Sequence, residues 1–339
     1  MSFSKGGGAV SSLLDKYGPN TPAQGVQAFF IFIIVFVAFA AALPPDVSGL
    51  LLNYGSRSSQ ITGGADGDGT TSNGGTTGTS NETREGWLAS FAAKLTSYGQ
   101  VPHQWFVHFY MLSFACSLFW LHQHVSSGPA LRGIAVHQTK HAGKAELSMT
   151  LGQVYLAWCM MLVQGSRRLY EDLYVKKQSK SPMWVVHWLL GLGFYSAMSV
   201  AVWIEGSGAL LTPYPPTAAQ LLDIPIIKMM VGGGLFIIGS RMQHQCHVHL
   251  ASLKKYSLPT DVMFSKLVCP HYTAECLIYV GMAVAAAPPH AMLNKTVLCA
   301  LIFVATNLGI TAYGTRKWYA EKFGEDKLIG KWNMIPWVF

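Results

Sequence analysis

The stretch Val26–Leu43, VQAFFIFIIVFVAFAAAL, decides the class of fold, because it contains no charged residue. A helix of about 20 mostly apolar residues can cross the hydrocarbon core of a bilayer. The run is longer than the apolar part of a secretory signal peptide, and the region before it is only weakly basic. Pro44 and Pro45 follow and interrupt helical hydrogen bonding. We therefore predict an N-terminal segment over 1–25 and a retained first transmembrane helix over 26–43.

The composition of the whole chain points the same way. Of its 339 residues, 50% are hydrophobic and only 12% are charged. Soluble domains carry about twice that share of charged residues. The net charge of +8 comes from basic residues in short clusters between apolar runs, which suits loops beside an anionic leaflet or an anionic cofactor. We expect membrane lipid as a partner and exclude nucleic acid.

Further apolar runs of transmembrane character follow the first one. They cover about 105–121, 151–163, 184–204, 224–239, 272–287 and 297–313. We predict an all-α integral membrane protein with about seven transmembrane helices. The fifth run is the weakest, because it contains Lys228 and the triplet Gly232-Gly233-Gly234.

Basic residues in the short loops predict the orientation. Lys and Arg are concentrated after the third run, after the fifth run and in the C-terminal tail, so we predict a cytosolic C-terminus and a lumenal N-terminus. Arg132, Lys140 and Lys144 oppose this pattern, because they fall in a loop that is predicted to be lumenal.

One interhelical segment differs in composition from the others. Residues 53–85 are rich in Gly, Ser and Thr and cannot bury a core, so we predict a disordered loop there. Trp87, Phe91 and Leu95 then recur at helical spacing, which predicts a short helix on the membrane surface. The remainder, 86–339, is predicted to be one membrane domain with its catalytic part over about 149–339. The apolar, aromatic end of the chain is expected to dock against the bundle.

The cytosolic segments carry the polar residues that suggest chemistry. Arg167 and Arg168 end the third run and serve either as topology anchors or for phosphate recognition, and Glu171 is spaced to pair with Arg167 on one helix face. His244 and His247 lie three residues apart, but no carboxylate or further Cys/His set completes a metal site, so we predict no metal. Glu275 lies about one turn inside the sixth run, where an ionisable residue is either functional or paired with an arginine for structure.

These segments, in this order, resemble the steroid 5α-reductase family, and most closely its polyprenol reductase branch. The similarity lies in Val101–Tyr110, in SRRLYEDLYV from Ser166, in QHQCHVHLASLK from Gln243, in Tyr272–Tyr279 and in the PWVF end. It covers about 100–339 and excludes the Gly/Ser/Thr-rich loop. No motif of another reaction class is present: the sequence lacks GxSxG, HExxH and Walker motifs.

The resemblance implies a seven-helix fold with NADPH held from the cytosolic side. The residues it places around the dinucleotide are Arg167, Arg168, Gln243, His247, Lys254, His271, Glu275, Arg316 and Tyr319. The family often has His, Asn and His where Gln164, His271 and Arg316 stand. Three residues are candidates to donate a hydrogen bond to the substrate oxygen: Tyr110, Gln164 and Tyr170.

The resemblance also implies hydride transfer to a double bond conjugated with a carbonyl. Developing negative charge needs such a carbonyl, so we expect an enal, a long-chain prenyl lipid such as polyprenal, as the immediate substrate. The expected role is reduction of the alpha-isoprene bond in dolichol synthesis at the endoplasmic reticulum, in support of protein N-glycosylation. The alternatives are a steroid 3-oxo-4-ene reductase, a prenyl-directed membrane methyltransferase and a lipid transporter.

Overall fold

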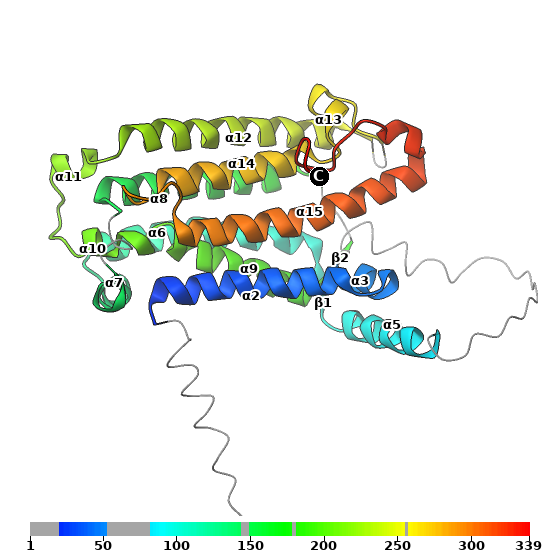
Figure 1. Ribbon diagram of the computed structural model, residues 1–339, viewed down its shortest axis with the longest axis horizontal. Coiled ribbons are helices and arrows are strands. Elements are labelled where there is room, and N and C mark those ends of the chain that lie inside the picture. The colour runs from blue at the N-terminus through cyan, green and yellow to red at the C-terminus, as the bar shows by residue number, and fades with distance from the viewer. Residues whose placement is uncertain (1–19, 53–81, 144–148, 178–180, 255–256) are drawn as a thin grey trace, which may run out of the picture.

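Seven long helices run side by side in the computed structural model (Figure 1), which describes residues 20–52, 82–143, 149–177, 181–254 and 257–339. In chain order they are α2 (Pro22–Ala42), α6 (Val107–Val125), α8 (Leu151–Tyr170), α9 (Val185–Ala201), α12 (Ile226–Ser252), α14 (Pro270–Ala285) and α15 (Lys295–Phe323). Each one overlaps a predicted apolar run. The prediction of a mostly helical protein is therefore confirmed.

Three of these helices extend well past the apolar run that predicted them. The runs over 151–163, 224–239 and 297–313 correspond to α8, α12 and α15, which continue to residues 170, 252 and 323. Apolar composition marks only the part of a helix that suits the hydrocarbon core, whereas helical hydrogen bonding continues into polar sequence. The polar extensions carry most of the residues that the sequence singles out as functional.

Within the described part of the chain, four helical segments are long and apolar enough to cross a membrane: Pro22–Ala42, His103–Val125, Val185–Leu210 and Lys295–Phe323. They indicate a multi-pass membrane protein. The full set of seven spans and the cytosolic C-terminus stay predictions. The loops rich in Lys and Arg nevertheless gather at one end of the bundle, where α12 ends, α14 begins and the C-terminus lies (Figure 1).

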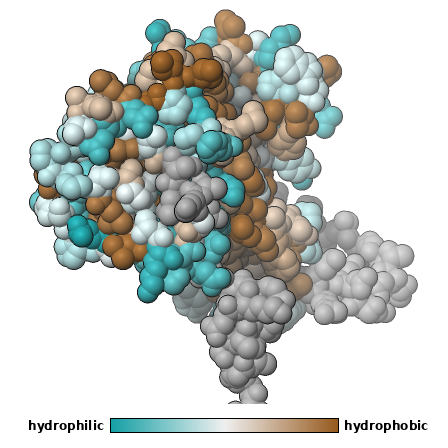
Figure 2. Space-filling view, turned by 60° about the vertical axis from the view of Figure 1, so that its left-hand side comes forward, coloured by the Kyte–Doolittle hydropathy of each residue, from teal (hydrophilic) through white to brown (hydrophobic). Residues whose placement is uncertain are grey.

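Helix α2 begins where the sequence provides helix-starting signals. The Thr21 side chain accepts a hydrogen bond from the Gln24 amide, the Gln24 side chain caps Thr21 in return, and Pro22 occupies the first helical position. Phe30 and Ile33 are fully buried, whereas Phe32 and Phe39 are each 65% exposed. Such a large apolar outer face suits lipid contact. Figure 2 shows hydrophobic residues gathered along the flank of the bundle.

Shorter elements complete the two ends of the bundle. The short helices are α3 (Pro45–Leu52), α5 (Glu82–Ser97), α10 (Ser207–Leu210), α11 (Ala218–Leu222) and α13 (Val262–Lys266). Three 3-10 turns lie before α6, before α10 and after α15, at His103–Phe106, Ile204–Gly206 and Glu325–Leu328. A two-stranded antiparallel sheet pairs β1 (Gln100–Pro102) with β2 (Pro182–Trp184), which are far apart in the chain. Helix α5 is the predicted surface helix and starts inside the predicted loop over 53–85, whose other residues lie outside the described ones.

The longest helix that was not predicted from the sequence has 13 residues. Helix α7 (Pro129–His141) lies where a loop was expected, and it carries Arg132 and Lys140. It buries Leu131 and Ala135 in the core of the bundle. Because it is short and has only a narrow apolar stripe, its composition alone does not mark a transmembrane run.

Helices α12 and α14 approach each other closely at glycine positions. A Cβ atom added at Gly232 would lie 2.6 Å from the backbone oxygen of Gly281, and one added at Gly281 would lie 2.6 Å from the oxygen of Gly232. Small residues permit such close backbone contact between membrane helices. Gly233 and Gly234, the other members of the triplet, have no atom within 4 Å of an added Cβ.

We predict that Gly232→Ala lowers stability by about 1–3 kcal/mol, since the added methyl group meets backbone atoms that cannot move aside. Gly233→Ala is the matched control and is expected to leave stability unchanged or slightly higher, because alanine favours the helix. Thermal unfolding of the two purified variants in detergent measures the difference. Equal melting temperatures for the two variants would contradict this account of the α12–α14 contact.

Candidate active site

A cavity of about 780 Å³ lies inside the bundle. Its apolar wall comes mainly from α2, α9 and α15, with Phe36, Val37, Leu190, Phe194 and Phe303 among the lining residues. Its polar wall comes from α6, from the end of α8, from α12 and from the start of α14. That wall includes Tyr110, Arg168, Glu171, Gln243, His247, His271 and Glu275.

The polar wall depends on an irregularity at the end of α8. Residues Glu171–Val175 form a π-helical turn, and the Lys176 amide donates to the Glu171 carbonyl oxygen at 2.8 Å. Short π segments of this kind often occur at functional sites. Here the turn directs Glu171 and Asp172 into the protein, where both are buried.

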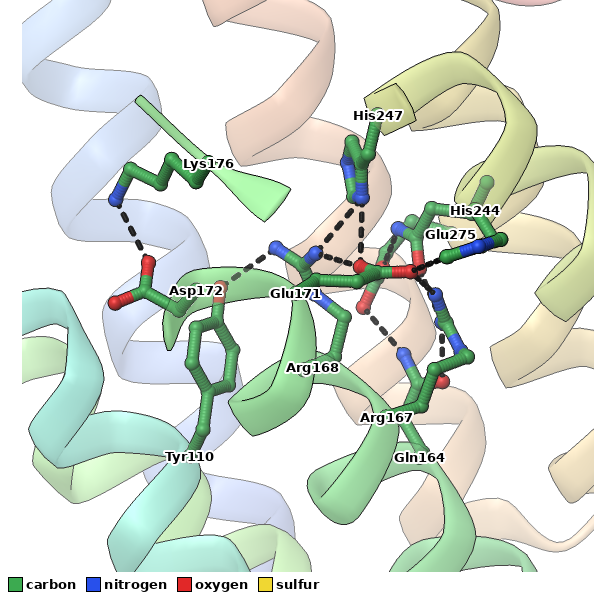
Figure 3. A network of polar contacts seen from close by, with 11 residues as sticks. Tyr110, Gln164, Arg167, Arg168, Glu171, Asp172, Lys176, His244, His247 and Glu275 are labelled. Atoms are coloured by element: carbon green, nitrogen blue, oxygen red, sulfur yellow. Dashed lines mark hydrogen bonds and ion pairs between the residues drawn. The ribbon is translucent and has the colours of Figure 1, made fainter. Parts of the chain in front are cut away.

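The Glu171 carboxylate is the centre of a network of basic side chains (Figure 3). Its Oε1 accepts a hydrogen bond from Arg167 and lies 2.9 Å from His244 Nδ1. Its Oε2 accepts from Arg168 and lies 2.7 Å from His247 Nδ1. The side chain is only 2% exposed. The expected pairing of Glu171 with Arg167 is confirmed.

The network keeps Glu171 ionised. Burial alone would raise the pKa of this carboxyl group, but the hydrogen bond from His247 and the positive charges of Arg168 and Arg167 outweigh burial. The pKa of Glu171 is consequently well below its ordinary value. The site therefore contains a permanent negative charge whose partners come from two helices.

Arg168 connects this carboxylate to α6. Its Nη2 donates to the Tyr110 hydroxyl oxygen at 2.6 Å, and its guanidinium carbon lies 4.8 Å from the centre of the Tyr110 ring. A phenol that accepts one hydrogen bond still has its own O–H to donate. The adjacent positive charge makes that O–H a stronger donor. Tyr110 is thus prepared to donate a hydrogen bond to a group inside the cavity.

A second layer of polar contacts joins Arg167 to α14. Arg167 Nη2 donates to the Gln164 side-chain oxygen at 2.7 Å and also to the Gln243 side-chain oxygen. Gln164 and Gln243 in turn donate to the two carboxylate oxygens of Glu275, the Gln164 bond being 3.4 Å long. Glu275 is therefore held by neutral amides, and it lines the cavity.

The structure brings together eight of the twelve residues that the sequence placed in the site. Six line the cavity: Tyr110, Arg168, Gln243, His247, His271 and Glu275. Gln164 and Arg167 lie behind them in the network described above. These positions agree with a shared site, but their individual roles stay predictions.

The other four residues do not line the cavity. Tyr170 is 53% exposed and packs on Tyr174, with 5.4 Å between the ring centroids. Lys254 is exposed just after the end of α12. Arg316 and Tyr319 lie on α15 and contact the C-terminal residues of the chain. The geometry therefore does not support direct contact of these four side chains with a ligand in this cavity.

Some residues of the site were not chosen from the sequence. His244 was considered as a metal ligand or as part of a polar patch at a helix end, and was not placed in the site, yet it contacts Glu171. No group of three or more metal-ligating side chains occurs among the described residues. Asp172 and Lys176 form a 2.8 Å ion pair on the cavity wall. The only sequence signal was spacing, because Asp172 and Lys176 are four residues apart.

The sequence is similar to one protein-family model and to several known proteins. The family model for 3-oxo-5-alpha-steroid 4-dehydrogenase matches residues 184–339. Polyprenal reductase 1 of rice, Oryza sativa subsp. indica, is 30% identical over 299 residues, which cover 74% of this chain and 82% of the relative. Polyprenal reductase of Xenopus laevis is 30% identical over 280 residues, covering 76% and 81%.

The chain belongs to the steroid 5α-reductase family. Polyprenal reductase of Saccharomyces cerevisiae is 34% identical over a shorter stretch of 173 residues, which covers 51% of this chain and 60% of the relative. Within the family, the match over 184–339 includes α12 and α14, which carry His247 and Glu275. It starts after the arginine pair and Glu171, the centre of the polar network.

We predict that Glu171→Gln destabilises this 5α-reductase family member by about 2–3 kcal/mol, because two guanidinium groups lose their buried counter-charge. Asp172→Asn is the neighbouring control. Its partner Lys176 is 37% exposed, so the expected loss is below about 1 kcal/mol. Chemical or thermal unfolding in detergent measures both losses.

The pH dependence of stability in wild type and Glu171→Gln tests the depressed pKa of Glu171. A carboxyl group with a depressed pKa stabilises the folded state above its unfolded pKa of about 4, and this contribution is lost as the pH falls further. The stability difference between wild type and Glu171→Gln should be constant from pH 6 to pH 8 and should shrink below about pH 4. A difference that already shrinks near neutral pH would show that the carboxylate is not stabilised in this way.

Proposed function

We propose that this protein is an NADPH-dependent polyprenal reductase that reduces the alpha-isoprene double bond of a long-chain prenyl lipid. The observation that carries the proposal is that one cavity has both a polar wall with Arg168, His247 and Glu275 and an apolar wall from α2, α9 and α15. A dinucleotide and an apolar substrate can meet in such a space. The relatives named polyprenal reductases support the choice of substrate.

The side chains of the polar wall fit a pyridine dinucleotide. Guanidinium groups bind phosphate, and imidazoles and carboxylates form hydrogen bonds with ribose and amide groups. Arg168, Gln243, His247, His271 and Glu275 would hold NADPH, with Gln164 and Arg167 supporting them from behind. When bound, the cofactor supplies a hydride. The cavity volume of about 780 Å³ lies within the range of typical ligand pockets.

The apolar wall fits a prenyl chain that enters from lipid. Phe36 and Phe39 of α2 line the cavity and are also 39% and 65% exposed. The cavity wall at these residues is thus also the surface that we assign to lipid. A chain of isoprene units longer than the cavity has room to extend past α2 into the bilayer, without contact with water.

Tyr110 is the best-placed donor to the substrate oxygen. Reduction of a carbon–carbon double bond by hydride leaves negative charge that a conjugated aldehyde can accept, whereas an allylic alcohol cannot. Tyr110 has its O–H free to stabilise that charge, since the bond with Arg168 uses only the hydroxyl oxygen. Gln164 donates to Glu275 and Tyr170 lies outside the cavity, which makes both less suitable than Tyr110.

We place this reaction in dolichol synthesis, at the cytosolic face of the endoplasmic reticulum membrane, in support of protein N-glycosylation. The polar wall comes from residues near the ends of α8 and α12 and the starts of α6 and α14. These helix ends lie at the same end of the bundle (Figure 1), which supports a cofactor site that opens to the cytosol. Seven spans with a cytosolic C-terminus are part of the same proposal.

We predict that purified protein in detergent oxidises NADPH when polyprenal is added, and does so poorly with polyprenol. A 3-oxo-4-ene steroid is the comparison substrate, and S-adenosylmethionine is the comparison cofactor for the methyltransferase alternative. Glu275→Ala should abolish turnover, because it removes a charged group from the cavity wall. Equal turnover of polyprenal and polyprenol would refute the requirement for an aldehyde, and no turnover of either lipid would refute the function.

We predict that Tyr110→Phe lowers kcat for polyprenal by about 10²–10³-fold, which is the usual loss when one oxyanion donor is removed. The Kd for NADPH should stay within about twofold, because the ring is retained. Tyr155→Phe on α8 is the control and should leave kcat unchanged, since that residue does not line the cavity. A larger loss in Tyr170→Phe than in Tyr110→Phe would assign the donor to Tyr170 instead.

A further inference from the structure

The C-terminal residues of the chain form a strap beside the start of α14. We use the name C-terminal strap for residues 328–339. The expected docking occurs, but through Leu328 and Met334, which are 2% and 1% exposed, and not through Trp337 and Val338, which are 84% and 77% exposed. The buried pair packs with Val268, Cys269 and Ala312 in a small cluster separate from the main core.

Main-chain hydrogen bonds attach the strap to the segment that precedes α14. The Trp332 amide donates to the Lys266 oxygen at 2.9 Å, and the Val268 amide donates to the Trp332 oxygen at 2.9 Å. The Cys269 amide donates to the Asn333 oxygen at 3.0 Å, which completes a short parallel pairing. The pairing fixes the direction in which the chain enters α14.

Helix α14 needs this support because it has no side-chain cap of its own. Its N-cap residue is Cys269, whose side chain makes no capping hydrogen bond. Within the first turn of the helix, Thr273 donates its hydroxyl to the Met334 oxygen of the strap. His271 and Glu275, which line the cavity, lie on either side of Thr273 in the sequence. The strap therefore contacts the same helical turn that carries two side chains of the polar wall.

Arg316 holds the strap from the opposite side. Its Nη1 donates to the Lys331 oxygen at 2.7 Å and to the Asn333 side-chain oxygen at 3.5 Å, while Nη2 donates to the Leu328 oxygen at 3.2 Å. A guanidinium group can bind two carbonyl oxygens at fixed spacing, which a lysine ammonium cannot reproduce. Arg316 thus anchors the strap to α15, which also contributes cavity residues such as Asn307 and Thr311.

We infer that Arg316 is a positioning residue for the cofactor site and acts through the C-terminal strap, without touching the cofactor. The inference rests on the proposed function only in assigning NADPH to the polar wall. It also accounts for the arginine at this position, which does not line the cavity and donates to oxygens of the strap.

The first test is the Kd of NADPH, measured by titration of tryptophan fluorescence in purified full-length protein. Arg316→Ala should raise the Kd and the KM for NADPH by about tenfold, with kcat at saturating NADPH changed by less than about twofold. Arg316→Lys should give an intermediate Kd, because one of the two carbonyl contacts can be retained. Lys317→Ala is the matched control on the same helix, and it should bind NADPH as wild type does.

Hydrogen–deuterium exchange separates positioning from direct contact. In cofactor-free Arg316→Ala, the amides of Val268 and Cys269 should exchange faster than in wild type, while those of α6 should be unchanged. Unaltered exchange at these two amides, together with weaker NADPH binding, would assign Arg316 to direct contact and overturn the inference. An unaltered Kd for NADPH in folded Arg316→Ala would overturn it as well.

A second variant keeps the test open if Arg316→Ala does not fold. Thr273→Val removes the hydroxyl that donates to Met334 and keeps the shape of the side chain. It should raise the Kd for NADPH in the same direction by a smaller factor, and an unchanged Kd would count against the strap. If wild-type protein binds NADPH but does not reduce polyprenal, the proposed substrate is refuted. The role of the strap can still be tested, because that test measures the Kd for NADPH.

Discussion

The polar half of the site is held in place by a buried carboxylate between two guanidinium groups. Glu171 is 2% exposed and joins the end of α8 to His244 and His247 of α12. Through Arg168 the network reaches Tyr110 on α6, and through Arg167 and Gln243 it reaches Glu275 on α14. A charge removed from water must be paired, so these contacts form together or leave an unpaired ion inside the protein. The need to pair these charges holds the ends of α6, α8, α12 and α14 close together.

The need to pair buried charges also explains why the cavity has one polar and one apolar wall. The charged network occupies the ends of the helices, whereas the apolar parts of α2, α9 and α15 form the rest of the cavity. Close contact between Gly232 and Gly281 brings α12 against α14, which keeps Gln243 within reach of Glu275. Helix packing and polar pairing therefore support each other, and the enclosed space combines a polar surface with an apolar one.

Two arginines of this protein show how position decides the role of a side chain. Arg168 lines the cavity and polarises a tyrosine, whereas Arg316 binds main-chain oxygens of the C-terminal strap. Both use the forked geometry of the guanidinium group. The position of each arginine in the bundle decides whether that fork faces a ligand or the protein itself.

The sequence alone determined that the protein is helical and apolar enough for a membrane, and it located the long helices, because transfer of apolar residues to lipid depends on local composition. It also located Arg168, His247 and Glu275, whose residue types and order carry the family resemblance. Composition did not find α7 or the polar ends of α8 and α12, since these depend on packing and hydrogen bonding. Spacing placed Glu171 beside Arg167, but only the tertiary structure decided that Glu171 also contacts His244 and His247 of α12, that Tyr170 faces outward and that Arg316 holds the strap. Those roles depend on distances between helices far apart in the chain, which no local pattern encodes.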